Sequence, residues 1–380
     1  MHIAFLTSEY PHPKVAHAAG IGTSIKNLVD ALVEKKIKVT VFVYGQISND
    51  FFKENGIDFY LIKHQKHQFG TWFFYRKNIQ NFINKIIKNN KIDILEAPDW
   101  TGITAFMNFK IPLIIRFHGS DAYFCHLEKR KQKIKNFWFE KLALKNAKAY
   151  IAPTDFAGKL SQKIFNLNSK KIKIIHNGIQ LKYFENSNPY VFQKGLVLYI
   201  GTIIRKKGVL ELPKIFECVL KQFPDATLLL IGADANDIVT NSLSTWQLFQ
   251  EKSNAELLKN VQYLGKIPYK EIQSYIQKAN VCVFPTFAET LGMVTVESMA
   301  MQKAIVTSDF GWTNEIIINN ESGFLINPKK HQDFANAIID ILKNDDFALQ
   351  TGVNARIRVE EIFDINKIVQ QNIDFYQSFI

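Results

Sequence analysis

Cysteine and long hydrophobic runs are both scarce in this 380-residue sequence. The three cysteines, Cys125, Cys218 and Cys282, lie far apart and form no Cys-x-x-Cys pair, which argues against a disulfide framework and indicates a reducing cytosol. No window approaches the roughly 18 apolar residues that a membrane-spanning helix requires. The first apolar run, Ile3 to Leu6, has only the length of a strand and no basic segment before it, so it does not suggest a signal peptide. These absences predict a cytoplasmic protein.

Side chains with the spacing of metal ligands are missing as well. No two aspartates lie two residues apart, and no cluster of histidines and cysteines has ligand spacing. We therefore expect neither a metal ion nor a cofactor, and we expect protein cations to meet the charge of any anionic substrate.

Positive charge is unevenly distributed along the chain. Residues 1–190 contain 29 Lys and Arg against 14 Asp and Glu, an excess of 15, whereas residues 191–380 contain 18 against 21. Lysines mostly solvate surfaces, but this segregation also suggests that the first half faces an anionic partner. The basic stretch 128–148 includes aromatic residues. It predicts either an amphipathic helix on an anionic membrane or a long domain helix that buries one face.

Short β-rich runs alternate with segments of helical period along the whole chain. The run 39–44 is apolar almost throughout, and the segment 24–35 before it is amphipathic. Apolar strands alternating with helices predict parallel sheets covered on both faces, and right-handed crossovers make them doubly wound. After the polar stretch 185–190 the pattern restarts. The sequence therefore predicts an α/β fold of two Rossmann-like domains, residues 1–188 and 189–364, facing a central cleft.

Two glutamates lie in FAETLGMVTVESMA (residues 287–300), which otherwise has the composition of a protein core. The preceding strand ends at Pro285, so Glu289 is predicted in a loop and Glu297 about one turn into a helix that Gly292 opens. A loop carboxylate suits sugar hydroxyls or an oxocarbenium-like charge, and one on the helix suits the two vicinal hydroxyls of a ribose. Free N–H groups at the helix start attract phosphate. The alternative of two solvated charges is less favoured, because an unpaired carboxylate on a buried helix is costly.

The same glutamates carry a resemblance to a known family. Glu289, seven residues, Glu297 and the downstream Gly311-x-x-x-Glu315 resemble the donor-site signature of retaining glycosyltransferases of family 4, which have the GT-B fold. The resemblance covers nearly the whole chain. It implies a nucleoside-diphosphate sugar as donor and a C-terminal helix, residues 365–380, that crosses back onto the first domain.

In the first half of the chain, two segments match the family in order. Gly20 and Gly22 resemble the glycine loop between the first strand and the first helix, near the donor phosphate and the acceptor; the alternative is a plain flexible turn. His118, in RFHGSD, matches the histidine that approaches the donor sugar, although a lone histidine at a strand end is more often structural. Asp121 is expected on the acceptor side, where it would orient nearby groups or cap the next helix.

In the second half, GTIIRKKGVLEL resembles the strand and loop that supply basic residues to the diphosphate. Arg205 and Lys207 would neutralise the leaving group there, although Thr202 stands where many members have an arginine. Lys266 and Ile267 lie in a segment that resembles the loop whose backbone reads the base. The resemblance implies catalytic roles for His118, Glu289, Arg205 and Lys207. It implies donor binding by Gly20, Gly22, Gly201, Arg205, Lys207, Lys266, Ile267, Glu289, Leu291, Gly292, Met293, Val294 and Glu297.

The resemblance predicts a retaining, metal-independent glycosyltransferase that moves a sugar to a glycan or lipid-linked acceptor, in cell-surface polysaccharide or lipopolysaccharide synthesis. Front-face attack, with the departing phosphate taking the acceptor proton, is the expected route. Two alternatives stay open: a nucleotide-sugar epimerase of the same fold, and a donor-binding subunit without activity. We expect no nucleic-acid partner. Peripheral contact of the basic first domain with the inner face of an anionic membrane is a further hypothesis.

Overall fold

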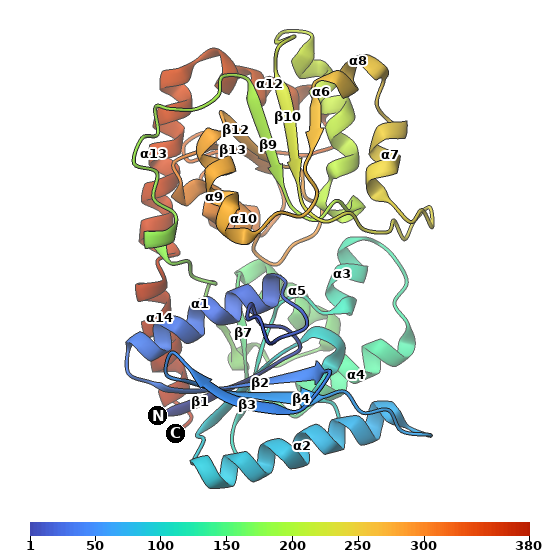
Figure 1. The fold of residues 1–380 in the computed structure, drawn as a ribbon, viewed down its shortest axis with the longest axis vertical. Helices are drawn as coiled ribbons and strands as arrows, with labels where there is room; N and C mark the ends of the chain where they lie inside the picture. Colours follow the sequence, from blue (N-terminus) through green and yellow to red (C-terminus); the bar gives the residue numbers. More distant parts are fainter. The chain divides into compact units, whose positions relative to one another are not determined.

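The computed structural model describes all of residues 1–380 (Figure 1). The chain forms two compact units. Unit 1 contains Met1–Ile179 and Asp364–Ile380, and unit 2 contains Gln180–Phe363.

The change of unit after Ile179 comes earlier than the sequence-based boundary at 188/189. The reason is that the residues in between contact unit 2. Asn186 Nδ2 donates to the Met301 carbonyl at 3.1 Å, and Arg356 donates to the Phe184 carbonyl at 2.8 Å.

Unit 1 is built on a mixed, eight-stranded sheet. Its strands are β1 (His2–Thr7), β2 (Lys38–Gln46), β3 (Asp50–Glu54), β4 (Ile57–Lys63), β5 (Ile94–Pro98), β6 (Leu113–Arg116), β7 (Ala149–Ala152) and β8 (Ile172–Ile174). Their order is β3-β4-β2-β1-β5-β6-β7-β8, and every neighbouring pair is parallel except β3 with β4.

The antiparallel edge strand β3 is not predicted by the apolar pattern, because most of its residues are exposed. A turn signal marks it instead. Asn55 and Gly56 connect β3 to β4 with positive φ angles of 49° and 79°, and Asn-Gly is the preferred pair for such a two-residue hairpin turn.

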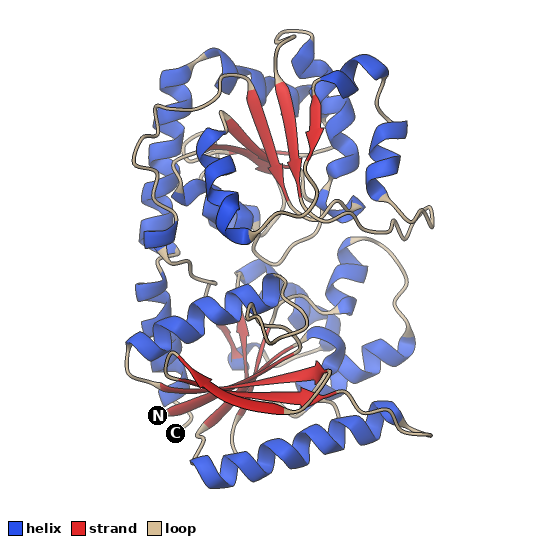
Figure 2. Cartoon of the chain, viewed as in Figure 1, coloured by secondary structure: helices blue, strands red, loops and turns tan.

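Alternate residues of the unit 1 strands pack on opposite faces of the sheet, as the two-residue period of a strand requires. In β1, Ile3 and Phe5 join a core with α1 (Gly20–Glu34) and α14 (Ile365–Gln377), whereas Ala4 and Leu6 join a core with α2 (Thr71–Asn90). Figure 2 shows helices on both sides of this sheet. The helices and 3-10 turns of unit 1 are α1 (Gly20–Glu34), α2 (Thr71–Asn90), η1 (Trp100–Gly102), α3 (Asp121–Leu127), α4 (Ile134–Lys145), α5 (Asp155–Phe165), η2 (Ser169–Lys171) and α14 (Ile365–Gln377).

Unit 2 is built on a six-stranded sheet in which all neighbouring strands are parallel. Its strands are β9 (Leu196–Ile200), β10 (Thr227–Ile231), β11 (Val261–Tyr263), β12 (Val281–Phe284), β13 (Ala304–Ser308) and β14 (Phe324–Ile326). The order β11-β10-β9-β12-β13-β14 is the doubly wound order 3-2-1-4-5-6. From β9 the chain adds strands first toward one edge of the sheet and then, from β12, toward the other edge. Ligands bind at the carboxyl ends of the strands at such a switch point.

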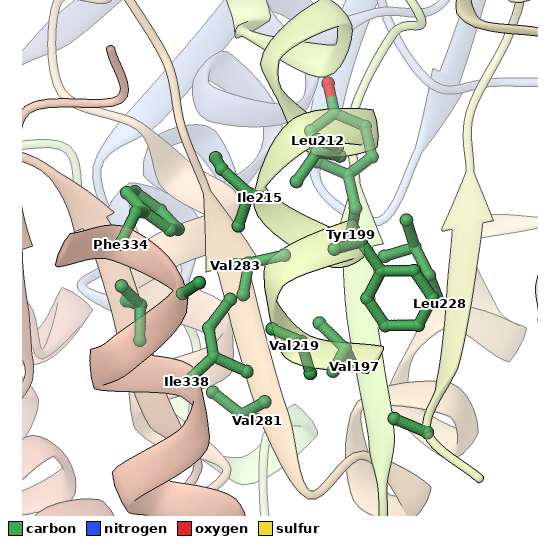
Figure 3. Packing of buried hydrophobic residues seen from close by; sticks show 14 of the residues in the cluster. Val197, Tyr199, Leu212, Ile215, Val219, Leu228, Val281, Val283, Phe334 and Ile338 are labelled. Carbon is green, nitrogen blue, oxygen red and sulfur yellow. The ribbon is translucent and has the colours of Figure 1, made fainter. Parts of the chain in front are cut away.

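The helices and 3-10 turns of unit 2 are η3 (Leu181–Tyr183), η4 (Arg205–Lys207), η5 (Val209–Glu211), α6 (Leu212–Leu220), α7 (Thr245–Glu251), α8 (Ala255–Lys259), α9 (Tyr269–Lys278), α10 (Met293–Ala300), α11 (Thr313–Ile316), α12 (His331–Lys343) and α13 (Asp345–Ile362). Helices α6 and α12 pack on one face of the sheet. Figure 3 shows this core, with aliphatic and aromatic side chains of β9, β10 and β12 against those of the two helices. The labelled side chains are Val197, Tyr199, Leu212, Ile215, Val219, Leu228, Val281, Val283, Phe334 and Ile338.

The predicted α/β class with two doubly wound sheets is confirmed. None of the helices combines the length and the apolar character needed to cross a membrane.

Candidate active site

Two loops flank the switch point of unit 2. The first is η4, which follows β9, and the second follows β12 and runs from Pro285 to Gly292. They are held together by the backbone, because the Phe287 N–H donates to the Lys206 carbonyl at 2.8 Å. Gly208 permits this approach: its φ is +73°, and a Cβ there would lie 1.7 Å from the Pro285 carbonyl oxygen. A glycine after the basic turn is therefore a steric requirement of the site.

Lys207 and Glu289 meet between these two loops as an ion pair. Burial, and to a smaller extent the neighbouring Lys206, lower the pKa of the Lys207 ammonium, while the Glu289 carboxylate favours its charged form. The pair lines a pocket at the carboxyl ends of β9, β12 and β13. The lining residues are Tyr199, Ile200, Lys207, Phe284, Thr286, Glu289, Leu291, Gly292, Val294, Thr295, Thr307, Trp312 and Thr313.

Arg205 has a different partner from the one expected. Its Nε and Nη2 donate to the two carboxylate oxygens of Asp237 at 2.7 and 2.8 Å. Asp237 is 1% exposed, and it also accepts from the backbone N–H and hydroxyl of Thr240. The Arg205 bond is the main cause of a lowered pKa at Asp237. In the structure, Lys207 is therefore the cation of η4 that lines the pocket, and Arg205 fixes the loop after β10.

The helix α10 begins in the pocket. Gly292 precedes it with a φ of +94°, and no side chain caps the helix N-terminus. Leu291, Gly292 and Val294 line the pocket, whereas Met293 does not. The N–H groups of a first helical turn are available to an anion, so this end of α10 can accept a phosphate group.

Glu297 lies one turn into α10 and is 3% exposed. Its Oε1 accepts the Tyr269 hydroxyl at 2.5 Å. Burial raises the pKa of Glu297 to about 7, while the Tyr269 bond opposes the rise. The expected position of Glu297 is found, and its phenol partner was not predicted.

Three more predicted donor residues follow β9 and β11, and none of them lines the pocket. Gly201 follows β9, and its N–H donates to the Ile231 carbonyl at 2.9 Å. Lys266 is exposed and Ile267 is half-buried, in the loop between β11 and α9. This loop and η4 therefore follow strands that lie two places apart in the sheet.

In unit 1, His118 follows β6 in a segment held by two buried carboxylates. Asp99 accepts the His118 N–H at 2.8 Å, and Glu140 accepts the Asp121 and Ala122 N–H groups at 2.7 and 3.1 Å. Burial raises the pKa of Asp99 to about 7 and that of Glu140 to about 6. Burial also lowers the pKa of His118 to about 3, so its imidazole is neutral at physiological pH.

Asp121 is the first residue of α3 and is not the helix cap. Ser120 is the cap, since its hydroxyl accepts the Tyr123 N–H at 3.1 Å. The Asp121 carboxylate instead accepts from Arg130 at 3.0 Å and from Asn136 at 3.3 Å. These bonds lower its pKa although burial opposes the shift. Asp121 is therefore not the helix cap, and its place on the acceptor side stays a prediction.

Gly20 and Gly22 form the first turn of α1, so the expected loop is in fact helical. Glu9, after β1, explains the early start of the helix: its Oε1 accepts the Gly22 N–H at 2.7 Å. A Cβ at Gly22 would lie 3.0 Å from the Glu9 backbone, so the close approach favours glycine. A carboxylate therefore already lies at the helix end where a phosphate was expected.

Comparison with known proteins identifies the family. The profile described as "Glycosyl transferases group 1" matches residues 184–358, and the profile "Glycosyltransferase Family 4" matches residues 18–183. The chain belongs to glycosyltransferase family 4. It is a glycosyltransferase that takes its sugar from a nucleotide sugar, which favours the transferase over the epimerase and the inactive subunit.

Curated relatives of this glycosyltransferase come from several organisms. An uncharacterised glycosyltransferase of Methanocaldococcus jannaschii is 25% identical over 90% of this chain and 89% of its own. The capsular polysaccharide biosynthesis glycosyltransferase CapM of Staphylococcus aureus is 26% identical over 66% of this chain and 68% of its own.

Solved structures show the fold. Sucrose-phosphate synthase of Thermosynechococcus elongatus matches with a TM-score of 0.78 and 21% identity, over 99% of this chain and 98% of its own. Anabaena HepE in complex with UDP and glucose matches with a TM-score of 0.77 and 17% identity, over the whole of both chains. The glycosyltransferase therefore has a GT-B-like fold of two α/β units.

Four site residues of the glycosyltransferase were missed from the sequence. Asp237, Tyr269, Asp99 and Glu140 each bond to a predicted residue or segment. A local signal exists only for Tyr269, which follows Pro268 at a helix start. No group of three or more His, Cys, Asp or Glu side chains is placed to hold a metal ion.

Proposed function

We propose that this glycosyltransferase is a retaining enzyme that binds a UDP-sugar in unit 2 and transfers its sugar to a hydroxyl of a glycan or lipid-linked acceptor. The observation that carries the proposal is the Lys207–Glu289 pair beside the open N-terminus of α10. Uridine nucleotides are the first ligands to test, because HepE was crystallised with UDP and with UDP-glucose. Cell-surface polysaccharide or lipopolysaccharide synthesis is the proposed pathway, and CapM is a relative with a capsular role.

The donor groups are assigned from the positions of the side chains. The ribose hydroxyls face Glu297, and the diphosphate faces the N–H groups of α10 together with Lys207. On binding, the Lys207 ammonium exchanges the Glu289 carboxylate for the diphosphate. Glu289 then accepts hydroxyls of the sugar or stabilises an oxocarbenium-like charge. The backbone of Lys266 and Ile267 contacts the base.

The proposed chemical step keeps the configuration at the anomeric carbon. The bond from this carbon to the β-phosphate oxygen breaks, and the acceptor oxygen forms its bond on the same face. The acceptor proton passes to the departing phosphate oxygen. Lys207 stabilises the charge on that phosphate. Arg205 supports the turn through its pair with Asp237. For unit 1 we propose that His118 approaches the donor sugar and that Asp121 lies on the acceptor side.

A nucleotide-binding experiment tests the donor site. Glu297→Gln is expected to weaken UDP binding roughly 10- to 150-fold, because a hydrogen bond to a charged acceptor becomes one to a neutral amide. Isothermal titration calorimetry with UDP measures the change. Glu256→Gln, at an exposed position of α8, is the matched control and should bind like the wild type. Equal affinity of the wild type and Glu297→Gln would show that the ribose assignment is wrong.

We also propose that unit 1 contacts an anionic membrane through an aromatic and basic surface. The helical part of the basic stretch is shorter than expected, only Ile134–Lys145, and its aromatic side chains pack beside the start of α2. Phe139 stacks on Trp72 with ring centroids 5.4 Å apart, and Lys135 Nζ lies 5.6 Å from both rings. Ile134 is 77% exposed and Trp138 is 52% exposed. Exposed aromatic and aliphatic side chains among lysines suit an anionic interface.

Vesicle binding tests this surface. Replacing Lys129, Lys131, Lys133 and Lys135 by glutamine should reduce binding to phosphatidylserine vesicles by roughly tenfold or more at low salt, since each basic residue contributes about 1 kcal/mol near such a surface. Arg130 is left in place, because it pairs with Asp121. High salt should also release the wild type, as the Debye length falls from about 10 Å at 0.1 M to about 3 Å at 1 M.

The control for this experiment neutralises four exposed lysines elsewhere in unit 1, Lys85, Lys88, Lys170 and Lys173, with the same change in net charge. Its binding should stay close to that of the wild type. If the wild type remains wholly in the supernatant in a low-salt sedimentation assay, the lysines only solvate a surface.

A further inference from the structure

Glu297 has an asymmetric environment. Its Oε1 accepts the Tyr269 hydroxyl at 2.5 Å, whereas its Oε2 accepts no hydrogen bond in the structure, although the residue is only 3% exposed. Oε2 is not among the fully buried atoms that lack a partner, so it is open to a donor from a ligand. A ligand that binds this carboxylate therefore meets two oxygens with different surroundings.

The Tyr269 side chain is itself held in place. It begins α9, directly after Pro268, and its ring meets Phe184 edge-to-face with centroids 6.5 Å apart. A short O–H···O bond to a charged oxygen is among the stronger hydrogen bonds in proteins. Tyr269 therefore fixes the rotation of the Glu297 carboxylate, and with it the direction of Oε2.

We infer that Tyr269 is a positioning residue that reserves Oε1 of Glu297, so that Oε2 reads one hydroxyl of the donor ribose more strongly than the other. The inference rests on the proposed function, which places the ribose at Glu297. It changes the expectation from the sequence, in which the carboxylate serves both vicinal hydroxyls alike. An oxygen that already accepts one short bond forms a weaker second one, so the hydroxyl at Oε1 contributes less.

The consequence is a preference between the two ribose hydroxyls. In the wild type, removing the hydroxyl that faces Oε2 should weaken binding roughly tenfold or more, and removing the other should change it only a few-fold. In Tyr269→Phe, both oxygens are available and the carboxylate can rotate. Removing either hydroxyl should then reduce the affinity of this variant by a similar factor.

Tyr269 also affects the protonation of Glu297. Burial raises the pKa of this carboxyl group to about 7 against the opposing effect of the Tyr269 hydrogen bond, and Tyr269 is the titratable side chain that interacts with it. Since the carboxylate is the stronger acceptor, donor affinity should fall as the pH drops through that pKa. Tyr269→Phe removes the stabilising bond, so the midpoint of the loss should move to higher pH.

Calorimetric titration with UDP, 2′-deoxy-UDP and 3′-deoxy-UDP tests the inference on the wild type and Tyr269→Phe. Tyr275→Phe, on the same helix, is the matched control and should keep the wild-type preference. UDP-glucose is used for the pH series, because its esterified diphosphate does not titrate near neutral pH. Unequal losses in the wild type that become equal in Tyr269→Phe, together with a raised pH midpoint, would support the assignment.

Three results would overturn it. If the wild type loses the same affinity for either deoxy ligand, or if Tyr269→Phe weakens all three ligands by one factor with the pH midpoint unchanged, Tyr269 has only a structural role. If the wild type binds none of the three ligands, the proposed UDP donor is wrong. The inference then fails together with the proposed function, and the absence of UDP binding distinguishes this case from the other two.

Discussion

Replacing Lys207 by methionine is expected to lower the rate of sugar transfer roughly 100- to 1,000-fold, the usual effect of removing one group that stabilises transition-state charge. Methionine keeps the length of the buried stem but has no charge. Negative charge grows on the departing diphosphate as the bond to the sugar breaks, so the loss should appear mainly in kcat and less in UDP affinity. Release of UDP from a UDP-sugar, measured with and without acceptor, gives the rate.

The neighbouring residue offers a control in the same turn. Lys206→Met removes the same charge from η4, but Lys206 does not line the pocket, so its rate should stay within a few-fold of the wild type. Each assay is repeated with a chelator, which should leave the wild-type rate unchanged, because the proposed charge stabilisation comes from side chains. Equal rates for Lys207→Met and Lys206→Met would remove Lys207 from the mechanism.

The parts of the site that could be predicted from the sequence are those with a local signal. Glu289 and Glu297 were placed on a loop and a helix because Pro285 ends an apolar run and Gly292 opens an amphipathic one. The doubly wound sheets follow in the same way from apolar runs that alternate with helical periods. These features depend on residues close together in the chain, so a pattern is enough to find them.

The partners of these residues could not be predicted, because each pair is far apart in the chain. Arg205 and Asp237 are 32 residues apart, and Tyr269 and Glu297 are 28 apart. Such pairs form only when the sheet brings the strand ends together. A carboxylate on a loop or a phenol at a helix start has no periodicity that would reveal its partner. The sequence could indicate a basic turn, but not that Asp237 binds Arg205 and leaves Lys207 to the pocket.

Two helix boundaries were misplaced for similar reasons. The segment of helical period begins at residue 24, whereas α1 begins at Gly20, where Glu9 accepts the Gly22 N–H from outside the helix although glycine is a poor helix former. The basic stretch was expected as one helix, yet α4 begins only at Ile134. Before it, Lys129 has a φ of +54° and Arg130 pairs with Asp121 and Glu128. In both cases a tertiary contact overrides local propensity.

The second large effect is expected on stability, from a buried ionic network in unit 1. Arg116 on β6 and Glu96 on β5 are 3% and 2% exposed, and two hydrogen bonds of 2.7 and 3.0 Å join them. The C-terminal helix α14 completes the network. Its Asn372 accepts from Arg116 at 2.6 Å, and its Tyr376 donates to Glu96 at 2.6 Å. The network therefore connects two central strands to the last helix of the chain.

Arg116→Leu should destabilise unit 1 by about 3–5 kcal/mol, because it leaves the Glu96 carboxylate buried without its cation. For a unit of this size the melting temperature should fall by roughly 6–20 °C in scanning calorimetry. Amide protons of α14 should also exchange faster, since Asn372 loses its donor and the helix loses part of its anchor.

The double variant Glu96→Leu/Arg116→Leu separates charge burial from the loss of packing. It removes both ions, and replacing a buried ion pair by apolar side chains is often neutral, so it should be more stable than Arg116→Leu alone. Lys163→Leu, an exposed cation of α5, controls for the change in net charge and should melt within a few degrees of the wild type. If Arg116→Leu melts like Lys163→Leu, the ion pair does not anchor α14. If the double variant is the less stable, the pair itself stabilises the unit, and desolvation does not dominate its energy.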